Sequence, residues 1–123
     1  MADHNVRLNY APTGQPPPND ITFAPDAANN PIRVRLGHTI SFRLGVGPPN
    51  GKVRVTFAQP QFFSTAKPDF QQTGRVDDGD GDVRVIAALP PGSRTTYHCE
   101  LLVNGVVTAQ SQENAGGEVV PAS

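Results

Sequence analysis

RTTYHCELLVNGVVTAQS, residues 94–111, combines the alternation of a strand with a strong hairpin signal. Four mainly apolar side chains stand at every second position and would share one face of an extended strand: Tyr97, Cys99, Leu101 and Val103. The pair Asn104-Gly105 tolerates the positive φ that both central residues of a type I′ turn require, and residues 106–109 then return as a second strand. Because an isolated hairpin is marginal in water, the stretch predicts a larger sheet around it.

Other short runs alternate in the same way and are separated by glycine and proline. They begin near residues 6, 21, 32, 40, 53 and 83. Twelve Gly and 13 Pro in 123 residues suit many short strands rather than long helices. Gly37-His38, inside IRVRLGHTISFRLGV, is expected to turn the chain toward a second sheet. The pattern therefore predicts an all-β fold, an antiparallel Greek-key β-sandwich of about seven to eight strands.

Three segments interrupt this pattern. Pro16–Pro18 favours polyproline II geometry and predicts a stiff connector. Residues 61–75 are expected to cross between the sheets, with one phenylalanine anchored in the core and another covering an edge. Residues 112–123 are mostly polar and predict a C-terminal tail with at most a short edge strand at Val119-Val120. We expect residues 1–123 to form a single domain.

Composition and charge limit the possible partners and compartments. Ten basic and eleven acidic residues give a formal net charge of -1, so no bulk attraction to nucleic acid is implied. A single cysteine cannot form an internal disulfide, and no apolar run approaches the roughly 20 residues that cross a bilayer. The start MADHNVRLNY lacks the basic and apolar regions of a secretory signal. We therefore expect a cytoplasmic protein with neither a membrane nor a nucleic-acid partner.

The segment ITFAPDAANNPIRVRLGHTISFRLG, residues 21–45, resembles the early part of cupredoxin-like domains. In those domains a strand that ends in Phe-x-Pro precedes two alternating strands around a Gly-polar-Thr corner. The order from NVRLNYAPTG through the Asn-Gly hairpin to ENAGGEVVP is also similar to the small bacterial proteins of the DP-EP family. Tyr97, two positions before Cys99, matches the tyrosine corner of immunoglobulin-like sandwiches, although a second Cys and a Trp are missing. These resemblances imply a two-sheet Greek-key sandwich and no particular activity.

Blue-copper chemistry makes a specific demand that this sequence does not meet. Such sites use two His and one Cys thiolate, usually with an axial Met. Tyr97-His98-Cys99 resembles part of that arrangement, but no His or Met follows Cys99. His98 and Cys99 would also project to opposite faces of their strand. We expect no copper site, and Cys99 as a small buried residue.

The acidic loop Asp77–Asp82 is the next candidate for a metal. Asp78, Asp80 and Asp82 stand at the D-x-D-x-D spacing of calcium loops. However, Val83 and Leu89 stand where an EF-hand needs Gly and Glu. Weak calcium binding by a metal-responsive protein is therefore an alternative to a solvated turn.

Basic residues occupy outward positions of three predicted strands: Arg33, Arg35, Arg43, Lys52 and Arg54. Sheets that bind nucleic acid interleave such charges with stacking aromatics, and these outward positions hold none. The five residues are expected either to be solvated and paired with acidic residues or to form one face for an acidic protein partner.

Catalytic motifs are missing from the sequence. His4, His38 and His98 are dispersed, and neither a Gly-rich phosphate loop nor a G-x-S-x-G elbow is present, so we expect no enzyme and no cofactor. The sequence predicts a non-enzymatic β-sandwich module for protein binding or assembly. Its partner would be an acidic protein or a second copy of itself.

Overall fold

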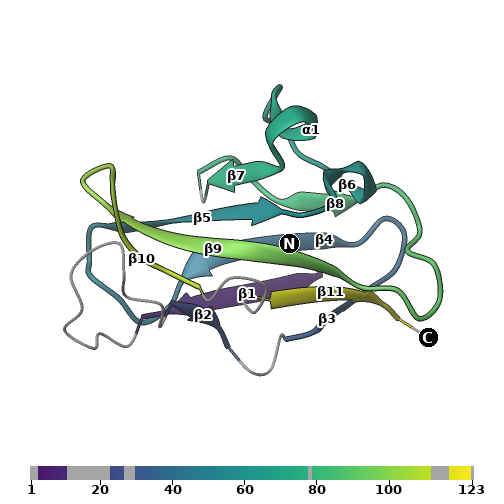
Figure 1. The fold of residues 1–123 in the computed structure, drawn as a ribbon, viewed down its shortest axis with the longest axis horizontal. Coiled ribbons are helices and arrows are strands. Elements are labelled where there is room, and N and C mark those ends of the chain that lie inside the picture. The colour runs from purple at the N-terminus through teal and green to yellow at the C-terminus, as the bar shows by residue number, and fades with distance from the viewer. Residues whose placement is uncertain (1–2, 11–22, 27–29, 78, 112–116, 123) are drawn as a thin grey trace.

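The computed structural model describes residues 3–10, 23–26, 30–77, 79–111 and 117–122. Within these ranges eleven strands form two sheets that pack together (Figure 1). The prediction of an all-β sandwich is confirmed. None of the helices within these ranges has the length and apolar character that crossing a bilayer requires.

The first sheet has the strand order β2-β1-β4-β8-β6. Its strands are β1 (His4–Asn9), β2 (Ala24–Pro25), β4 (Thr39–Leu44), β6 (Phe63–Ser64) and β8 (Val83–Val85). β1 and β4 run parallel, with Val6 opposite Phe42. Both of these side chains are buried, so the apolar positions of the two strands face the core together.

The second sheet has the order β3-β11-β9-β5-β7, with β10 also paired to β9. Its strands are β3 (Ile32–Val34), β5 (Gly51–Phe57), β7 (Arg75–Asp77), β9 (Thr95–Val103), β10 (Val106–Gln110) and β11 (Gly117–Pro121). β9 pairs with β5 on one edge, and with β11 and then β10 on the other. The hairpin stretch of the sequence is therefore the centre of this sheet.

The hairpin itself has the predicted geometry. Asn104 and Gly105 have φ values of 53° and 79°, and Val103 pairs with Val106. Along β9, three of the four alternating side chains are at most 2% exposed, namely those of Tyr97, Cys99 and Leu101. Local alternation thus predicted the core face of this strand correctly, apart from the half-buried end at Val103.

The turn at Gly37-His38 also matches its prediction, because β3 and β4 lie in different sheets. His38 N donates a hydrogen bond to Arg35 O at 3.1 Å, which closes the turn. Gly37 has a φ of 89°, in the left-handed region that glycine adopts without steric cost. The chain passes from the second sheet to the first at this point.

Three expectations about the fold are wrong. The sheets are mixed rather than antiparallel, since β1 pairs parallel with β4 and β3 parallel with β11. There are more strands than predicted, because several consist of only two or three residues. The region predicted as a tail contains β11, an inner strand whose Val119 is fully buried between β3 and β9. Pro16–Pro18 and residues 112–116 lie outside the described residues.

Residues 61–75 do connect the two sheets, by way of β6 in the first and β7 in the second. The segment also contains the end of a 3₁₀ helix, η2 (Pro60–Phe62), and a single helical turn, α1 (Phe70–Thr73). Phe63 and Phe70 are both buried, whereas one core phenylalanine was predicted. Phe62 is half-buried at the margin of the core.

An aromatic cluster joins the two layers. The ring of Phe57 lies 4.5 Å from Phe63, 5.9 Å from Phe42, 5.9 Å from Tyr97 and 6.0 Å from Phe70, measured between centroids. Phe42 and Phe63 belong to the first sheet, while Phe57 and Tyr97 belong to the second. Aromatic contacts at these separations stabilise a core beyond the area that they bury, so this cluster holds the sheets together.

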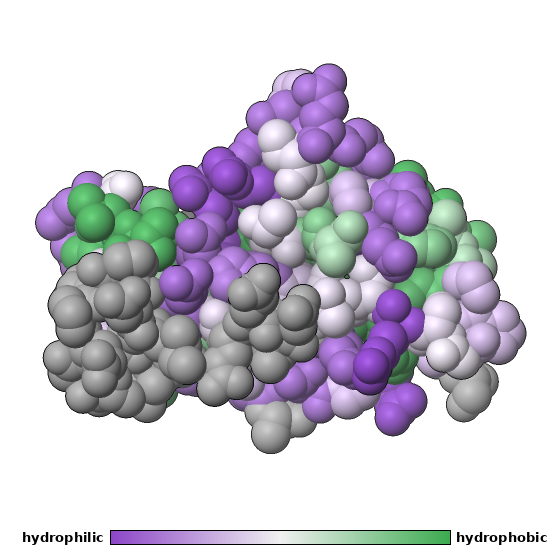
Figure 2. Space-filling view, viewed as in Figure 1, coloured by the Kyte–Doolittle hydropathy of each residue, from purple (hydrophilic) through white to green (hydrophobic). Residues whose placement is uncertain are grey.

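Figure 2 shows the face of the molecule on which β9 lies nearest the viewer. The apolar residues visible there gather at the two ends, and polar or neutral residues lie between them. The large apolar side chains with the greatest exposure are Leu36, Val46, Ile86 and Val106. Among the described residues visible in this view, the apolar ones are therefore divided between two ends rather than joined in one surface.

Candidate functional site

The predicted basic residues do not form one face. Arg33 lies on β3 and Arg35 directly after it, at one edge of the second sheet, whereas Arg43 lies on β4 in the first sheet. The outer faces of two packed sheets point in opposite directions. The hypothesis of a single basic surface is therefore wrong.

Arg54 behaves as a paired, solvated charge. Its Nε lies 3.0 Å from Oδ1 of Asp77, its cross-strand neighbour on β7. The other oxygen of Asp77 lies 3.7 Å from Lys67 Nζ, which is also 3.7 Å from Asp80 Oδ2. Lys52, on the same strand as Arg54, is exposed and makes no ion pair with any described residue. Asp77 and Asp80 thus pair with Arg54 and Lys67 beside β7.

The acidic loop is held as a turn by hydrogen bonds between Asp77 and Asp80. Asp77 N donates to Asp80 Oδ2 at 2.9 Å, and Asp80 N donates to Asp77 O at 3.0 Å. Asp82 is exposed, and Asp78 lies outside the described residues. Among the residues that the structure describes, no group of three or more Asp, Glu, His or Cys side chains is placed to hold a metal ion. The carboxylate of Asp80 is instead shared between the turn and Lys67.

One stretch of β4 has no neighbouring strand on its β8 side. β8 pairs with β4 only at Thr39 and Ile40, although β4 continues to Leu44. Before β8, the chain passes through Gly81, whose φ is 90°. Within the described ranges no strand pairs with this edge of β4 from residue 41 to residue 44.

A single hydrogen bond indicates which main-chain groups face that open edge. Gly45 N donates to Leu8 O on β1 at 2.8 Å, continuing the parallel ladder beyond β4. Alternate residues of a strand direct their N–H and C=O groups to opposite edges. The main-chain N–H and C=O groups of Arg43 therefore point toward β1, while those of Phe42 and Leu44 face the open edge.

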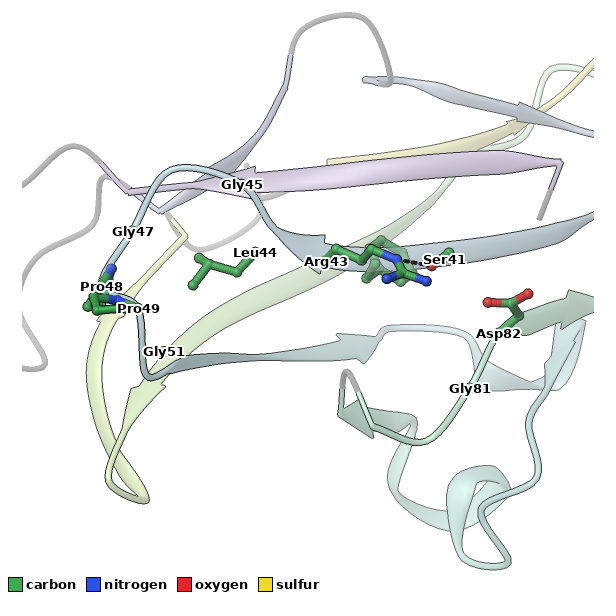
Figure 3. A pocket seen from close by; sticks show the side chains of 11 residues that line it. Ser41, Arg43, Leu44, Gly45, Gly47, Pro48, Pro49, Gly51, Gly81 and Asp82 are labelled. Atoms are coloured by element: carbon green, nitrogen blue, oxygen red, sulfur yellow. Dashed lines mark hydrogen bonds between the residues drawn. The ribbon is translucent and has the colours of Figure 1, made fainter. Parts of the chain in front are cut away.

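The open edge lines a groove of about 510 Å³ (Figure 3). One wall is β4 with the loop that follows it, and the opposite wall includes Gly81 and Asp82. Figure 3 shows the guanidinium of Arg43 and the carboxylate of Asp82 facing the same space. The groove therefore combines main-chain hydrogen-bonding groups with one positive and one negative side chain.

Arg43 has a basic neighbour that the sequence did not suggest. Arg7 on β1 lies directly opposite Arg43 in the parallel register, and both side chains are exposed. Arg43 Nε donates to Ser41 Oγ at 3.3 Å. Neither arginine makes an ion pair within the described part of the chain. The two form a basic pair beside the groove.

The structure brings together two of the three histidines that the sequence left dispersed. His4 Nε2 lies 3.0 Å from His38 Nδ1. His98 is separate, on β9 of the second sheet, with Nε2 3.1 Å from Gln110 Oε1 and Nδ1 3.0 Å from Ser111 Oγ. The pairing of His4 with His38 depends on the register between β1 and β4, which no local pattern reveals.

Cys99 is fully buried, as predicted. Burial raises the pKa of its thiol to about 12, so the reactive thiolate is strongly disfavoured near neutral pH. The neighbouring His98 faces away from it and is bonded to Ser111 and Gln110. Cys99 therefore contributes to packing and not to the groove.

No protein-family model, curated protein or solved structure matches this chain. The DP-EP and cupredoxin-like resemblances therefore stay predictions from the sequence. The fold is a sandwich of two mixed sheets. A fold does not determine a function, so the features that bear on function are the groove and its charges.

Proposed function

We propose that this protein is a non-enzymatic protein-binding module whose partner lays an extended acidic segment along the open edge of β4. The observation that carries the proposal is the unpartnered stretch of that edge, where the main-chain groups of Phe42 and Leu44 face the groove. An extended peptide added beside β4 would pair with these groups. Main-chain hydrogen bonds give affinity in this mode of recognition, and alternate side chains give specificity.

The charges beside the groove favour an acidic segment. In a strand added next to β4, alternate side chains project to the outer face, where Arg43 and Arg7 lie. A carboxylate at that position would pair with a guanidinium, which presents planar donors suited to it. Asp82 on the opposite wall would repel a second carboxylate, so it selects against acidic residues farther along the segment.

The groove lining does not support catalysis. Ser41 is the lining hydroxyl, it is only 6% exposed, and its Oγ accepts a hydrogen bond from Arg43 Nε, while the residues that line the groove include no histidine to which it could donate. An activated serine needs a neighbouring general base within hydrogen-bond reach. A binding role fits the groove better than a hydrolytic one.

The test uses two synthetic peptides with isotope-labelled protein. One peptide is an extended threonine-rich segment with a single central glutamate, and the control has lysine at that one position. We expect the acidic peptide to shift the amide resonances of Phe42 and Leu44 and to bind more weakly as salt rises, because screening weakens exposed charge pairs. The lysine peptide should leave these resonances unchanged.

Two charge reversals separate the groove from a general effect of charge. Arg43→Glu should abolish binding of the acidic peptide. Arg33→Glu, at an exposed position on β3 of the other sheet, should leave it within about threefold, since a distant surface charge contributes little. Equal loss in both variants, or no shift at millimolar peptide, would overturn the proposal. A dimer in gel filtration that Arg43→Glu abolishes would identify a second copy of the chain as the occupant instead.

A further inference from the structure

The chain contains two Asn-Gly pairs, Asn50-Gly51 and Asn104-Gly105. The structure places them side by side, because Asn50 Nδ2 donates a hydrogen bond to Asn104 Oδ1 at 3.4 Å. Both asparagines are exposed. An asparagine side chain is attacked most easily by the backbone nitrogen of a following glycine, which has no Cβ in the way and wide conformational freedom. Local structure therefore decides which of the two pairs reacts.

Gly51 is held in place. Its N–H donates to Pro48 O at 3.0 Å, and the residue begins β5, where it pairs with Val103. A Cβ at position 51 would lie 3.0 Å from side-chain carbons of both Leu44 and Leu101. The nitrogen that would attack the preceding asparagine is thus occupied, and its backbone is packed against neighbouring side chains.

Gly105 has none of these restraints. Its N–H makes no hydrogen bond within the described ranges, and a Cβ there would meet no atom beyond its chain neighbours within 4 Å. The connection between β9 and β10 projects from one end of the sandwich (Figure 1). The attack requires this turn to open, and Val106 beside it is already 61% exposed, so opening uncovers little apolar surface. Segments with few buried contacts open locally at low cost in free energy.

We propose that Asn104 is a site of spontaneous deamidation, and that the folded protein directs this reaction to Asn104 and away from Asn50. Gly105 N gives its proton to hydroxide and bonds to Cγ of Asn104. The Cγ–Nδ2 bond breaks, and Nδ2 takes a proton from water and leaves as ammonia. The resulting succinimide ring adds a water molecule at either of its carbonyl groups and opens to aspartate or isoaspartate. In the net reaction one water is consumed and one ammonia is released.

The product would change the outer face of the second sheet. Asn104 and Asn50 line a hairpin groove of about 370 Å³ together with Lys52, which makes no ion pair with a described residue. A carboxylate at position 104 would give this cation a partner. Isoaspartate also adds a methylene to the main chain, which a two-residue turn between paired strands cannot accommodate without a shift. Deamidation would therefore add a negative charge and loosen the end of the hairpin, independently of the open edge of β4.

The test incubates the native full chain at mildly alkaline pH and follows each asparagine by peptide mapping. Trypsin separates the two sites, because Asn50 falls in the peptide 44–52 and Asn104 in the peptide 95–123. Deamidation adds about 1 Da, and fragment ions assign it to position 104 rather than to Asn114 in the same peptide. We expect Asn104 to react at least about tenfold faster than Asn50, because its turn opens more readily. Asn104→Gln should suppress the modification at position 104 and leave the rate at Asn50 unchanged.

Incubation of the same protein in guanidinium chloride separates the effect of the fold from that of the sequence. Both glycine nitrogens are free in the unfolded chain, so Asn50 should become as reactive as Asn104. Equal rates in the native protein, or faster reaction at Asn50, would overturn the proposal. Absence of reaction at native Asn104, over a period in which the unfolded chain reacts, would also overturn it. So would a preference for Asn104 that persists after unfolding, because sequence rather than structure would then be its cause.

Discussion

Two hydroxyl groups in the core lack a hydrogen-bond partner among the residues that the structure describes. They are Oγ1 of Thr95 and Oη of Tyr97, and both residues lie on β9 with 2% of their surface exposed. Burial raises the pKa of Tyr97 well above its ordinary value, as expected for a hydroxyl in a dry environment. A buried hydroxyl without a partner costs about 1–3 kcal/mol of stability.

We therefore expect removal of either hydroxyl to stabilise the protein. Thr95→Val and Tyr97→Phe keep the shape of each side chain and delete only the polar group. Each should raise the free energy of unfolding by about 1 kcal/mol, the lower end of the cost of an unpaired buried hydroxyl. Gly117 packs so closely on the ring of Tyr97 that a Cβ at position 117 would overlap it. The ring is thus held in place, and the phenyl ring should occupy the same site.

Ser111→Ala is the matched control, because it deletes a buried hydroxyl that does have partners. Ser111 is also 2% exposed, but its Oγ accepts a hydrogen bond from Cys99 N at 2.9 Å and lies 3.0 Å from His98 Nδ1. Its removal leaves the buried amide of Cys99 without that acceptor. We expect a loss of about 1–3 kcal/mol, opposite in sign to the other two changes.

Urea denaturation near neutral pH, followed by far-ultraviolet circular dichroism, measures all three variants. Circular dichroism is preferred because the chain has no Trp and only two Tyr. A shift of the midpoint at constant slope reports the change in stability. If Thr95→Val and Tyr97→Phe both destabilise by about 1 kcal/mol or more, these hydroxyls make hydrogen bonds in solution and the reasoning fails.

Three further predictions concern the core. Phe57→Ala should cost about 3–5 kcal/mol in the same urea assay, and clearly more than Phe62→Ala at the half-buried margin, so equal losses would contradict the role of the aromatic cluster. Burial raises the pKa of the Cys99 thiol from its ordinary value of 9.0 to about 12. The corresponding contribution to stability is fully present below pH 9.0 and is lost as pH rises toward about 12. Stability should therefore fall by about 1.4 kcal/mol per pH unit in this window, and Cys99→Ala should flatten the decline between about pH 9 and pH 10. The native thiol should resist labelling, and rapid reaction without denaturant would count against its burial.

The facing of individual strands was predictable because alternation is a local property. Cys99 and Leu101 face the core on β9, as their spacing indicates. The neighbours of a strand are not local, however, and the sequence NVRLNY contains nothing that specifies parallel pairing with β4. The proximity of Arg7 to Arg43, and of His4 to His38, follows from that pairing alone.

The two errors about placement have distinct physical causes. Residues 112–123 were predicted as a tail with at most a short edge strand at Val119-Val120, because they are mostly polar and terminal. However, β3 and β9 lie on either side of β11, supply its hydrogen bonds and bury Val119. Arg33 and Arg43 were grouped because both alternate with apolar residues. The turn at Gly37-His38, which the sequence did predict, moves the chain to the other sheet and separates them.

The open part of β4 differs from the other free edges of this sandwich. The strands that end the two sheet orders are short, with two residues each in β2 and β6 and three each in β3 and β7, and the five-residue β10 beside β9 is interrupted by a register shift between Val107 and Ala109. Short edge strands give another sheet little to pair with and so limit aggregation. The open stretch of β4 lies inside its sheet and is walled by Gly81 and Asp82. A single extended segment can enter between these walls, whereas the edge of a second sheet would have to displace them, so the geometry favours a peptide over a copy of the whole domain.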